Sequence, residues 1–512
     1  MKQRLSGILM PVTSLPGAYG IGTMGKAAYD FVDFLKETKQ TYWQILPLTT
    51  TSYGDSPYQS FSAVAGNTNM IDLELLVAEG LLNLADIDGA NFGDNPEFIN
   101  YALLFDSRRQ VLEKATRAFL ADSANRARLS GFEEEQSSWL GDYAEFMAIK
   151  EHFGLVALQE WPDQRAIKRN PERLAELRVE LADAIAYHKV VQYFFFSQWL
   201  ALKTYANEQG IKIIGDMPIY VSADSVEVWT MPDLFKLDED RKPLYIAGCP
   251  PDAFSDVGQL WGNPIYDWPK HAETGFAWWI YRIAESLKLC DLLRIDHFKG
   301  FSDYWEIPAG SETAKTGQWV SGPGIALFDA VKHALGDLPI IAENLGYIDA
   351  KAEQLLDDSG FPGMKILQFG LFDTRANSID ILHNFTVNSI AYTGTHDNDV
   401  VNGWYANLTE EQAAFADAYL HRHPDEKITH AMLRNLFSSV SNVAIACMQD
   451  ILDKPANSRI NLPNTVGGNW EWRMLEEDIT DEHRDFLTKL TLLYDRAPEV
   501  LEENAQEEAE EA

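Results

Sequence analysis

Cysteine is scarce in this chain, which has only three cysteines in 512 residues. Cys249, Cys290 and Cys447 are far apart and form no CxxC pair, which argues against a disulfide framework and against a cysteine zinc site. Long apolar runs are also missing, because no window approaches the roughly 18 uninterrupted apolar residues of a membrane helix. The apolar stretch near the N-terminus is too short for a signal peptide. We therefore expect a cytoplasmic protein without a membrane partner.

Basic residues are outnumbered, with 42 Lys and Arg against 77 Asp and Glu and a formal net charge of −35. Such a charge repels phosphate backbones and anionic lipid headgroups, so neither nucleic acid nor membrane is expected as a partner. A neutral polar substrate suits it better. Much of the acidity at the C-terminus lies in residues 498–512, which we predict to be a disordered acidic tail.

Eight short apolar runs end in polar residues, glycine or proline. They are residues 7–11, 41–48, 211–221, 290–296, 338–346, 363–370, 388–398 and 458–464. Helical patterns such as 26–39 and 271–289 lie between several of them. Runs that are apolar on both faces and alternate with helices predict a parallel sheet covered by helices. Eight units favour an α/β fold of the (β/α)8 TIM barrel type, whose active site lies at the carboxyl ends of the strands. A doubly wound open sheet is the alternative.

The runs are unevenly spaced, and the two longest gaps predict insertions. Residues 65–185 show helical patterns and are expected to form an inserted helical subdomain. Residues 222–270 are rich in aromatic residues, proline and glycine and are expected to form a loop insertion over the active site. Residues 1–497 would then be one catalytic barrel that includes both insertions.

Charged residues gather where the predicted strands end. Arg294 and Asp296 in "RIDHFKG" are two apart, and therefore on one face of a strand that is otherwise apolar. Asp216, Glu343 and Asp397 close three other runs. In a barrel these ends share one rim, so several carboxylates would crowd a single arginine. When two carboxylates lie close together, repulsion moves their pKa values apart, so that one is ionised and the other protonated. Cleavage of a glycosidic bond requires one group of each kind.

Each of these residues also has a structural explanation. Arg294 and Asp296 could form an ion pair, Glu343 could cap a helix, and Asp216 could bond backbone amides at a strand end. Asp397 could belong to an Asx turn with His396 as its partner. The joint placement at four strand ends favours the catalytic interpretation over these separate ones.

Two other kinds of site are not supported. The pair His421 and His423 follows a helix and precedes a proline, so we interpret it as positive charge at a helix C-terminus and not as a metal site. The segment "GIGTMG" at 20–25 resembles a phosphate-binding loop, but Ala27 stands where the magnesium-binding Ser or Thr is needed. A dinucleotide site would want an acidic residue about twenty positions later. We expect a tight loop into a helix there, and no cofactor.

Aromatic residues cluster with small polar residues in two predicted loops. "SYGDSPYQSF" contains Tyr53, Asp55, Ser56 and Tyr58, and "SDVGQLWGNPIYDW" contains Trp261 and Asn263. Sugar rings stack on aromatic planes, and their hydroxyl groups bond to Asp, Asn and Arg, so both loops are candidate carbohydrate-binding segments.

The sequence resembles the amylomaltases, the 4-α-glucanotransferases of the α-amylase superfamily. The motifs that carry the resemblance occur in order along nearly the whole chain: "SLPGAYGIGTMG", "GDSPYQS", "GDMPIYV", "PPDAFSDVGQLWGNP", "RIDHFKG", "AENLG", "GTHDND" and "GNWEWR". The resemblance implies a barrel without a C-terminal β-domain. It also implies transfer of α-1,4-glucan segments between maltooligosaccharides by a retaining double displacement.

The resemblance also implies roles for individual residues. Asp296 would be the nucleophile, Glu343 the general acid/base and Asp397 the carboxylate that stabilises the transition state. Substrate-binding roles are implied for residues of the motifs and their neighbours: Arg294, His396, Asp216, Tyr58, Asp55, Ser56, Tyr53, Trp261, Asn263, Asp252, His297 and Asn469. One departure is Asn344, where an aspartate is common.

Two other functions stay open on the residues alone. An α-glucan hydrolase would use the same carboxylates in a wetter cleft. A non-catalytic glucan-binding protein would need a broken acid/base, whereas Asp296 and Glu343 are both present.

Overall fold

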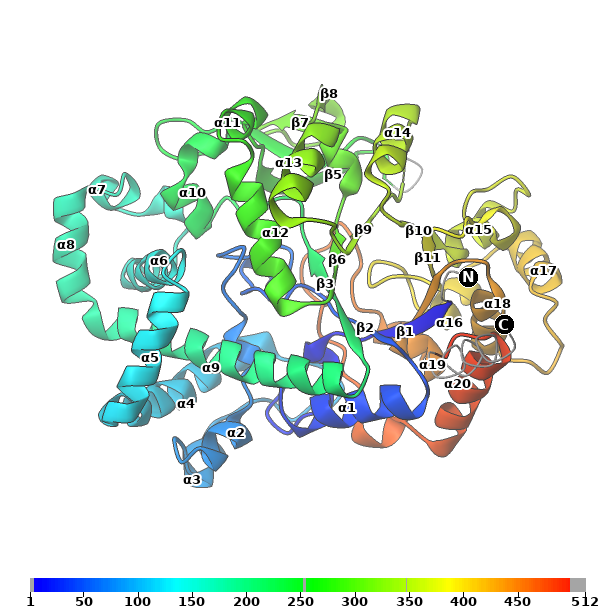
Figure 1. The fold of residues 1–512 in the computed structure, drawn as a ribbon, viewed down its shortest axis with the longest axis horizontal. Coiled ribbons are helices and arrows are strands. Elements are labelled where there is room, and N and C mark those ends of the chain that lie inside the picture. Colours follow the sequence, from blue (N-terminus) through cyan, green and yellow to red (C-terminus); the bar gives the residue numbers. More distant parts are fainter. Residues whose placement is uncertain (1–3, 252–254, 347, 498–512) are drawn as a thin grey trace, which may run out of the picture.

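A computed structural model describes residues 4–251, 255–346 and 348–497. Eight parallel strands of the described chain close into a barrel in the order β1-β12-β11-β10-β9-β6-β3-β2 (Figure 1). The strands are β1 Leu5–Leu9, β2 Tyr42–Gln44, β3 Lys212–Met217, β6 Leu292–Ile295, β9 Ile340–Ala342, β10 Gly363–Ile366, β11 Ser389–Tyr392 and β12 Val443–Cys447. The predicted (β/α)8 barrel is therefore confirmed, and the open sheet is excluded.

The eighth strand is not where the sequence predicted it. Residues 458–464 lie in a loop that follows a short turn at Ala456–Ser458. The strand that closes the barrel is β12, which pairs in parallel with both β1 and β11. Its sequence, VAIAC, is apolar throughout and lies between two helices, so hydrophobic periodicity does not separate it from the helical segments on either side.

Alternation along β6 explains how a charged pair occupies an apolar strand. Leu293 and Ile295 are buried among the residues that pack against the helices, whereas Leu292 packs with the side chains that fill the barrel. Arg294 and Asp296 continue on the side of Leu292, because side chains two apart share a face. Arg294 therefore faces the barrel interior, where it pairs in register with Ile341 of β9, one of the apolar residues that fill the barrel.

Helices surround the barrel and fill the interval between β2 and β3. That interval carries α2 Leu73–Ala78, α3 Leu84–Asp88, α4 Tyr101–Ala121, α5 Ser123–Glu135, α6 Leu140–His152, α7 Gln164–Ile167, α8 Pro171–Glu180 and α9 Ala182–Glu208. These helices extend to one side of the barrel (Figure 1). α9 packs on both α6 and α1, and it leads directly into β3. The limits of an inserted subdomain at 65–185 stay a prediction.

The remaining helices follow the barrel strands or lie in their connections. They are α1 Lys26–Glu37, α10 Val226–Thr230, α11 Trp268–Glu273, α12 Ala277–Leu289, α13 Ile325–Leu335, α14 Ala350–Ser359, α15 Leu367–Asp373, α16 Val401–Ala406, α17 Glu410–Tyr419, α18 Ile428–Ser438, α19 Met448–Ile451 and α20 Asp481–Leu493. The segment "GIGTMG" forms a loop that leads into α1, as predicted.

A second, antiparallel sheet stands beside the barrel. Its order is β5-β4-β7-β8, with β4 Tyr245–Cys249, β5 Gln259–Pro264, β7 Asp303–Pro308 and β8 Gln318–Ser321. The sequence predicted only a loop insertion at 222–270, but that stretch forms β4 and β5, which pair with each other, and β4 also pairs with β7, a strand that follows β6. The sheet thus ties the insertion to the segment directly after Asp296.

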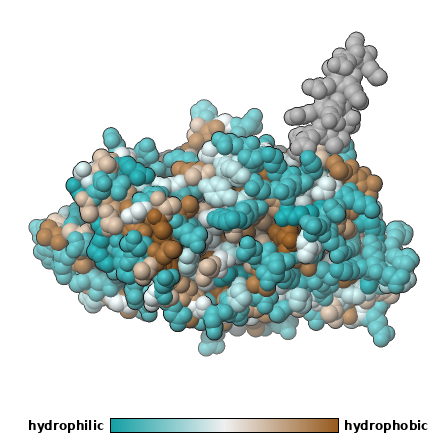
Figure 2. Space-filling model, turned by 90° about the horizontal axis from the view of Figure 1, so that it is seen from below, coloured by the Kyte–Doolittle hydropathy of each residue, from teal (hydrophilic) through white to brown (hydrophobic). Residues whose placement is uncertain are grey.

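The predicted acidic tail at 498–512 lies outside the described residues. Within them, no helix is both long and apolar enough to cross a membrane. The face in Figure 2 is mostly polar, with apolar side chains in separate patches.

Candidate active site

Arg294 is the centre of a buried charge cluster formed by three barrel strands. Its guanidinium donates from Nη1 to both carboxylate oxygens of Asp216, each at 2.6 Å, and both side chains are fully buried. Its Nη2 lies 3.2 Å from Asp296 and 3.2 Å from Glu343. One buried cation therefore compensates a carboxylate within β3 and two that follow β6 and β9, which is how charged residues are tolerated at the end of an apolar strand.

Asp296 and Glu343 form a closely spaced pair. Both contact the same nitrogen of Arg294, and each carboxyl group shifts the pKa of the other. The backbone holds Glu343 in place, because His297 N donates to its Oε2 at 2.5 Å and Phe298 N donates to its carbonyl at 3.1 Å. His297 has a positive φ of 52°, a sharp turn that presents its N–H to the carboxylate.

The surroundings shift the pKa values of the two carboxyl groups in opposite directions. Burial and the neighbouring charge of Glu343 raise the pKa of Asp296 well above its ordinary value. Burial opposes ionisation of Glu343 too, but Arg294 and the His297 amide outweigh it and lower the pKa of Glu343. The pair thus shares a proton, as carboxylates in contact do.

Asp397 reaches the same rim from the loop after β11, with 41% of its side chain exposed. Asn461 donates from Nδ2 to Asp397 Oδ1 at 2.6 Å, and Arg459 donates to the Asp397 carbonyl at 2.6 Å. His396 lies beside it, with Nε2 3.4 Å from Oδ2. The sequence prediction missed Arg459 and Asn461, because it placed residues 458–464 in a strand.

Tyr58 joins the loop after β2 to this cluster. Its hydroxyl donates to Asp216 Oδ2 at 2.7 Å, and its ring stacks on His396 with centroids 5.2 Å apart. Trp470 packs against both rings, with centroids 5.7 Å from Tyr58 and 5.9 Å from His396. Trp470 belongs to the motif "GNWEWR", but the sequence predicted no contact between it and the site. Tyr58, His396 and Trp470 together form an aromatic wall beside Asp216.

The second sheet approaches the carboxylates from the other side through Trp261 on β5. Its ring packs edge-on against His297, with centroids 4.8 Å apart. Burial lowers the pKa of His297 to about 4, so this imidazole is neutral at neutral pH. Asn263 is buried, and its amide donates to the Val221 carbonyl and accepts from Gln59. Asn263 therefore fixes the strand, and a direct contact with sugar stays a prediction.

Other predicted binding residues lie at the margin of the site. Asp55 lines a small cavity with Tyr101 and Trp470, where burial first and then Glu471 raise its pKa. Ser56 accepts a hydrogen bond from Tyr58 N at 3.2 Å and so shapes the loop. Asn469 bonds within the 462–469 loop, to Leu462 N and Thr465.

Two of the predicted residues cannot be placed in the site. Asp252 lies outside the described residues. Tyr53 lies in a short turn, Tyr53–Asp55, and its side chain is not described.

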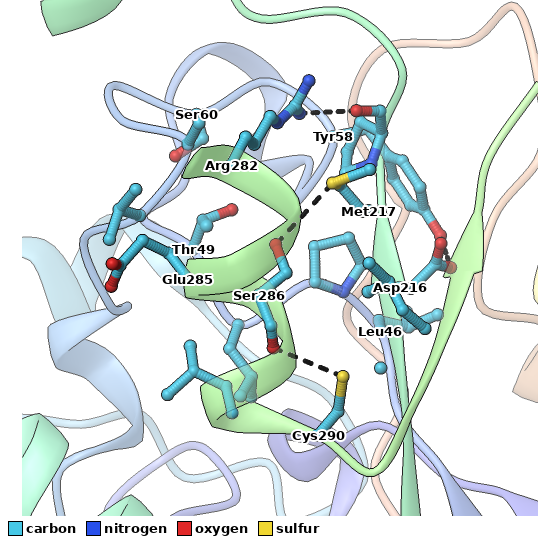
Figure 3. Close-up of a pocket in the computed structure, with 18 of the residues that line it drawn as sticks. Leu46, Thr49, Tyr58, Ser60, Asp216, Met217, Arg282, Glu285, Ser286 and Cys290 are labelled. Carbon is cyan, nitrogen blue, oxygen red and sulfur yellow. Dashed lines mark hydrogen bonds between the residues drawn. The ribbon is translucent and has the colours of Figure 1, made fainter. Parts of the chain in front are cut away.

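A cavity lies behind Asp216, between β3 and α12 (Figure 3). Tyr58 and Asp216 meet at one wall, and Arg282, Ser286 and Cys290 of the α12 region line another. Its lining is mostly apolar and does not include Asp296 or Glu343. The candidate chemistry therefore belongs to the strand ends and not to this cavity. Among the residues that the structure describes, no group of His, Cys, Asp and Glu is arranged to hold a metal ion.

Comparisons with known proteins agree with this geometry. The sequence model of the 4-alpha-glucanotransferase family matches residues 10–478. The chain is 53% identical over 502 residues to a 4-alpha-glucanotransferase of Streptococcus pneumoniae, covering 98% of this chain and 99% of that protein. The chain belongs to the 4-alpha-glucanotransferase family. A 4-alpha-glucanotransferase of Clostridium butyricum is 46% identical over 489 residues, covering 95% and 100% of the two chains.

Solved structures extend the family assignment to the fold. The amylomaltase of Streptococcus agalactiae, solved in complex with acarbose, superposes with a TM-score of 0.95 at 61% identity, covering 97% of this chain and 100% of that chain. The amylomaltase of Corynebacterium glutamicum, at 17% identity, shares the fold with a TM-score of 0.76 over 95% of this chain and 75% of that one. The chain is thus a 4-alpha-glucanotransferase, which leaves the hydrolase alternative less supported.

Proposed function

We propose that this 4-alpha-glucanotransferase moves α-1,4-glucan segments between maltooligosaccharides by a retaining double displacement at the ends of β6, β9 and β11. Asp296 attacks the anomeric carbon while Glu343 protonates the departing glycosidic oxygen. The part of the donor that carries the departing oxygen leaves, and the other part stays β-linked to Asp296 as a glucosyl-enzyme. Glu343, now a carboxylate, then takes the proton from a 4-hydroxyl of an acceptor glucan as that oxygen re-forms the α-1,4 link.

The observation that carries this proposal is the contact of both carboxyl groups with one nitrogen of Arg294. Retaining enzymes hold their two carboxyl groups about 5–5.5 Å apart, whereas inverting enzymes need about 6.5–9.5 Å to admit a water molecule. Two carboxyl groups that contact one nitrogen atom lie close together, which supports direct attack by Asp296 over attack by a water molecule held between them.

The mechanism needs the shared proton on Glu343 when the substrate is bound. A glycosidic oxygen beside Glu343 offers that proton a hydrogen-bond acceptor, and developing positive charge at the anomeric carbon favours an ionised Asp296. Both carboxyl groups contact one nitrogen of Arg294, so the proton has a short path between them. Arg294 keeps the pair singly charged before and after this shift.

The remaining residues have supporting roles in the proposal. Asp397 stabilises positive charge on the sugar ring, and the aromatic wall of Tyr58, His396 and Trp470 receives the donor sugar. Trp261 holds the acceptor side. Transfer must outcompete water, and an oriented acceptor reaches an effective molarity on the order of 10⁵ M or higher.

The test is incubation with maltotriose followed by chromatography of the products. A ladder of longer maltodextrins together with glucose is expected, since each transfer lengthens one chain and shortens another. Shorter products alone would mean hydrolysis. Asp296→Asn is expected to abolish turnover and to leave oligosaccharide binding largely intact, as measured by calorimetry. Full activity of that variant would overturn the assignment of the nucleophile.

A further inference from the structure

Asp450 is a buried acidic residue next to the proposed active site that the mechanism above does not use. It lies in α19, directly after β12, and is only 1% exposed. The carboxylates of the proposed mechanism follow β6, β9 and β11, whereas Asp450 comes from the βα unit of the eighth strand. A fully buried carboxylate is costly unless its oxygens are satisfied, so its partners indicate its role.

Both oxygens of Asp450 accept hydrogen bonds from the two ends of one loop. Thr393 Oγ1 donates to Oδ2 at 2.6 Å, and Val401 N donates to Oδ1 at 2.8 Å. Thr393 is the first residue after β11, and Val401 is the first residue of α16. Asp450 therefore fixes the separation between the end of a barrel strand and the start of the next helix.

The loop held in this way, residues 394–400, carries His396 and Asp397. Its other contacts also come from neighbouring βα units: Gln368 donates to the Asp399 carbonyl at 2.8 Å, and Arg459 and Asn461 bond to Asp397. Those contacts act on single groups inside the loop. Asp450 alone among these residues bonds to both ends.

We propose that Asp450 is a positioning residue that holds the 394–400 loop, and with it Asp397, at the height of the Asp296–Glu343 pair. This inference rests on the proposed function, in which Asp397 acts on the transition state. A displacement of about 1 Å at such a position costs on the order of 100-fold in rate. The loss falls on turnover more than on binding, because Asp397 is assigned to the transition state.

The surroundings of Asp450 make its hydrogen bonds to the 394–400 loop depend on pH. Burial first, and then the charges of Asp399 and Asp453, raise its pKa to about 6. Asp399 lies on the loop itself, where its carboxylate is 3.9 Å from Arg459, and Asp453 follows α19. Burial and Asp450 raise the pKa of the nearby Cys447 thiol well above its ordinary value, so that group is neutral. Above pH 6 the ionised Asp450 accepts from both partners, whereas below it one oxygen becomes a donor.

The experiment compares Asp450→Asn with a matched control, Asp453→Asn. The asparagine at 450 keeps the shape but replaces one acceptor by a donor. Asp453 accepts from Thr429 Oγ1 at 2.8 Å and from Asn402 Nδ2 at 2.9 Å, contacts that tie α16 and α18 to the segment after α19 without reaching the 394–400 loop. Initial rates of transfer from maltotriose and thermal unfolding are measured for each variant from pH 5 to 8.

For Asp450→Asn we expect kcat to fall at least tenfold at pH 7.5 with KM changed less than threefold. The ratio of wild-type to variant kcat should shrink toward one below about pH 6, because protonation makes the wild type similar to the variant. This ratio cancels the titration of Asp296 and Glu343, which both proteins share. Asp453→Asn should keep the wild-type kcat at pH 7.5, even if it unfolds at a lower temperature. Because the charge of Asp453 raises the pKa of Asp450, its removal should only move the fall in kcat to lower pH.

Three results would overturn the inference: a kcat within twofold of wild type at pH 7.5, a ratio that does not change with pH, or an equal loss in Asp453→Asn. If Asp450→Asn does not fold, Thr393→Val removes one partner and should lower kcat about threefold at unchanged KM; a full kcat would then count against the proposal. An inactive Asp397→Asn beside a fully active Asp450→Asn would overturn this inference only. An active Asp397→Asn would overturn the proposed role of Asp397 as well.

Discussion

At the scale of single residues, the spacing of charged residues predicted where they gather, but the motifs did not predict the hydrogen bonds of the asparagine side chains. Period-two alternation placed Arg294 and Asp296 on one face, and the structure joins them to Asp216 and Glu343. Asn263 and Asn469 are predicted from their motifs to bind sugar, and in the structure each bonds within the protein. Asn263 bonds to Val221 and Gln59, which are distant in the sequence, whereas Asn469 bonds to Leu462 and Thr465 of its own loop. The motifs did not predict these contacts.

A buried histidine should make stability depend on pH. Burial lowers the pKa of His271 from 6.5 to about 4, so the unfolded chain binds more protons between those values. Its contribution is therefore complete above pH 6.5 and is lost as the pH falls toward 4. The free energy of unfolding of wild type minus that of His271→Phe should fall by roughly 3 kcal/mol over this range.

Chemical denaturation at a series of pH values measures that difference. A flat profile for His271→Phe would contradict the assigned cause.

At the scale of elements, seven of the eight predicted runs overlap a barrel strand, and the eighth does not. Strands such as β3 and β6 were recognisable because a polar residue closes each apolar run. β12 has no such signal, since Val443–Cys447 leads into α19 without a turn residue. The second sheet escaped prediction because β4 pairs with β7, across an interval that contains β6. Long-range pairing of this kind leaves no local trace.

Trp261 on β5 is expected to influence the ratio of hydrolysis to transfer. Trp261 on β5 contacts His297, the residue next to Asp296. Removing the indole should loosen the acceptor side and admit water, so Trp261→Ala should raise hydrolysis relative to transfer severalfold. Release of reducing ends measured against chain-length redistribution gives the ratio. Trp319→Ala on β8 of the same sheet, where the side chain is 42% exposed, is the control; an unchanged ratio for Trp261→Ala would remove β5 from the explanation.

Gly25, at the start of α1, is a position where the structure has room only for glycine. A Cβ at Gly25 would lie 2.0 Å from the carboxylate of Asp72, which caps α2 and accepts from Thr23. Gly25→Ala should therefore lower the free energy of unfolding by about 1–3 kcal/mol. Gly131 lies within α5 with open space around it, so Gly131→Ala should raise stability by about 0.5–1 kcal/mol. Equal effects of the two changes would refute the steric argument.

At the scale of the whole molecule, the barrel is closed by strands from opposite ends of the described chain. β1 pairs with β12 from Leu5↔Val443 to Leu9↔Cys447. Arg496 covers this seam from below: its guanidinium donates to the carbonyls of Leu5, Phe437, Ser439 and Ser441 and is fully buried. Both ends of the described chain therefore meet at one place (Figure 1).

Arg496→Ala should lower the free energy of unfolding by about 2–5 kcal/mol, since it leaves several buried carbonyl groups unsatisfied. Arg484→Ala is the matched control, because Arg484 pairs with Glu37 at the surface and such pairs contribute less than about 1 kcal/mol. Denaturant titration measures both. Specific activity at low temperature should stay at the wild-type level in each, and a loss confined to activity would contradict the structural role of Arg496.

The pairing of β1 with β12 also constrains how the molecule is made. During translation β1 leaves the ribosome early, but its second neighbour is synthesised only when residues 443–447 appear. Until then one edge of a nascent, incomplete sheet stays unpaired, a condition that invites association with other chains. The growing polypeptide would thus benefit from chaperone protection through most of its synthesis.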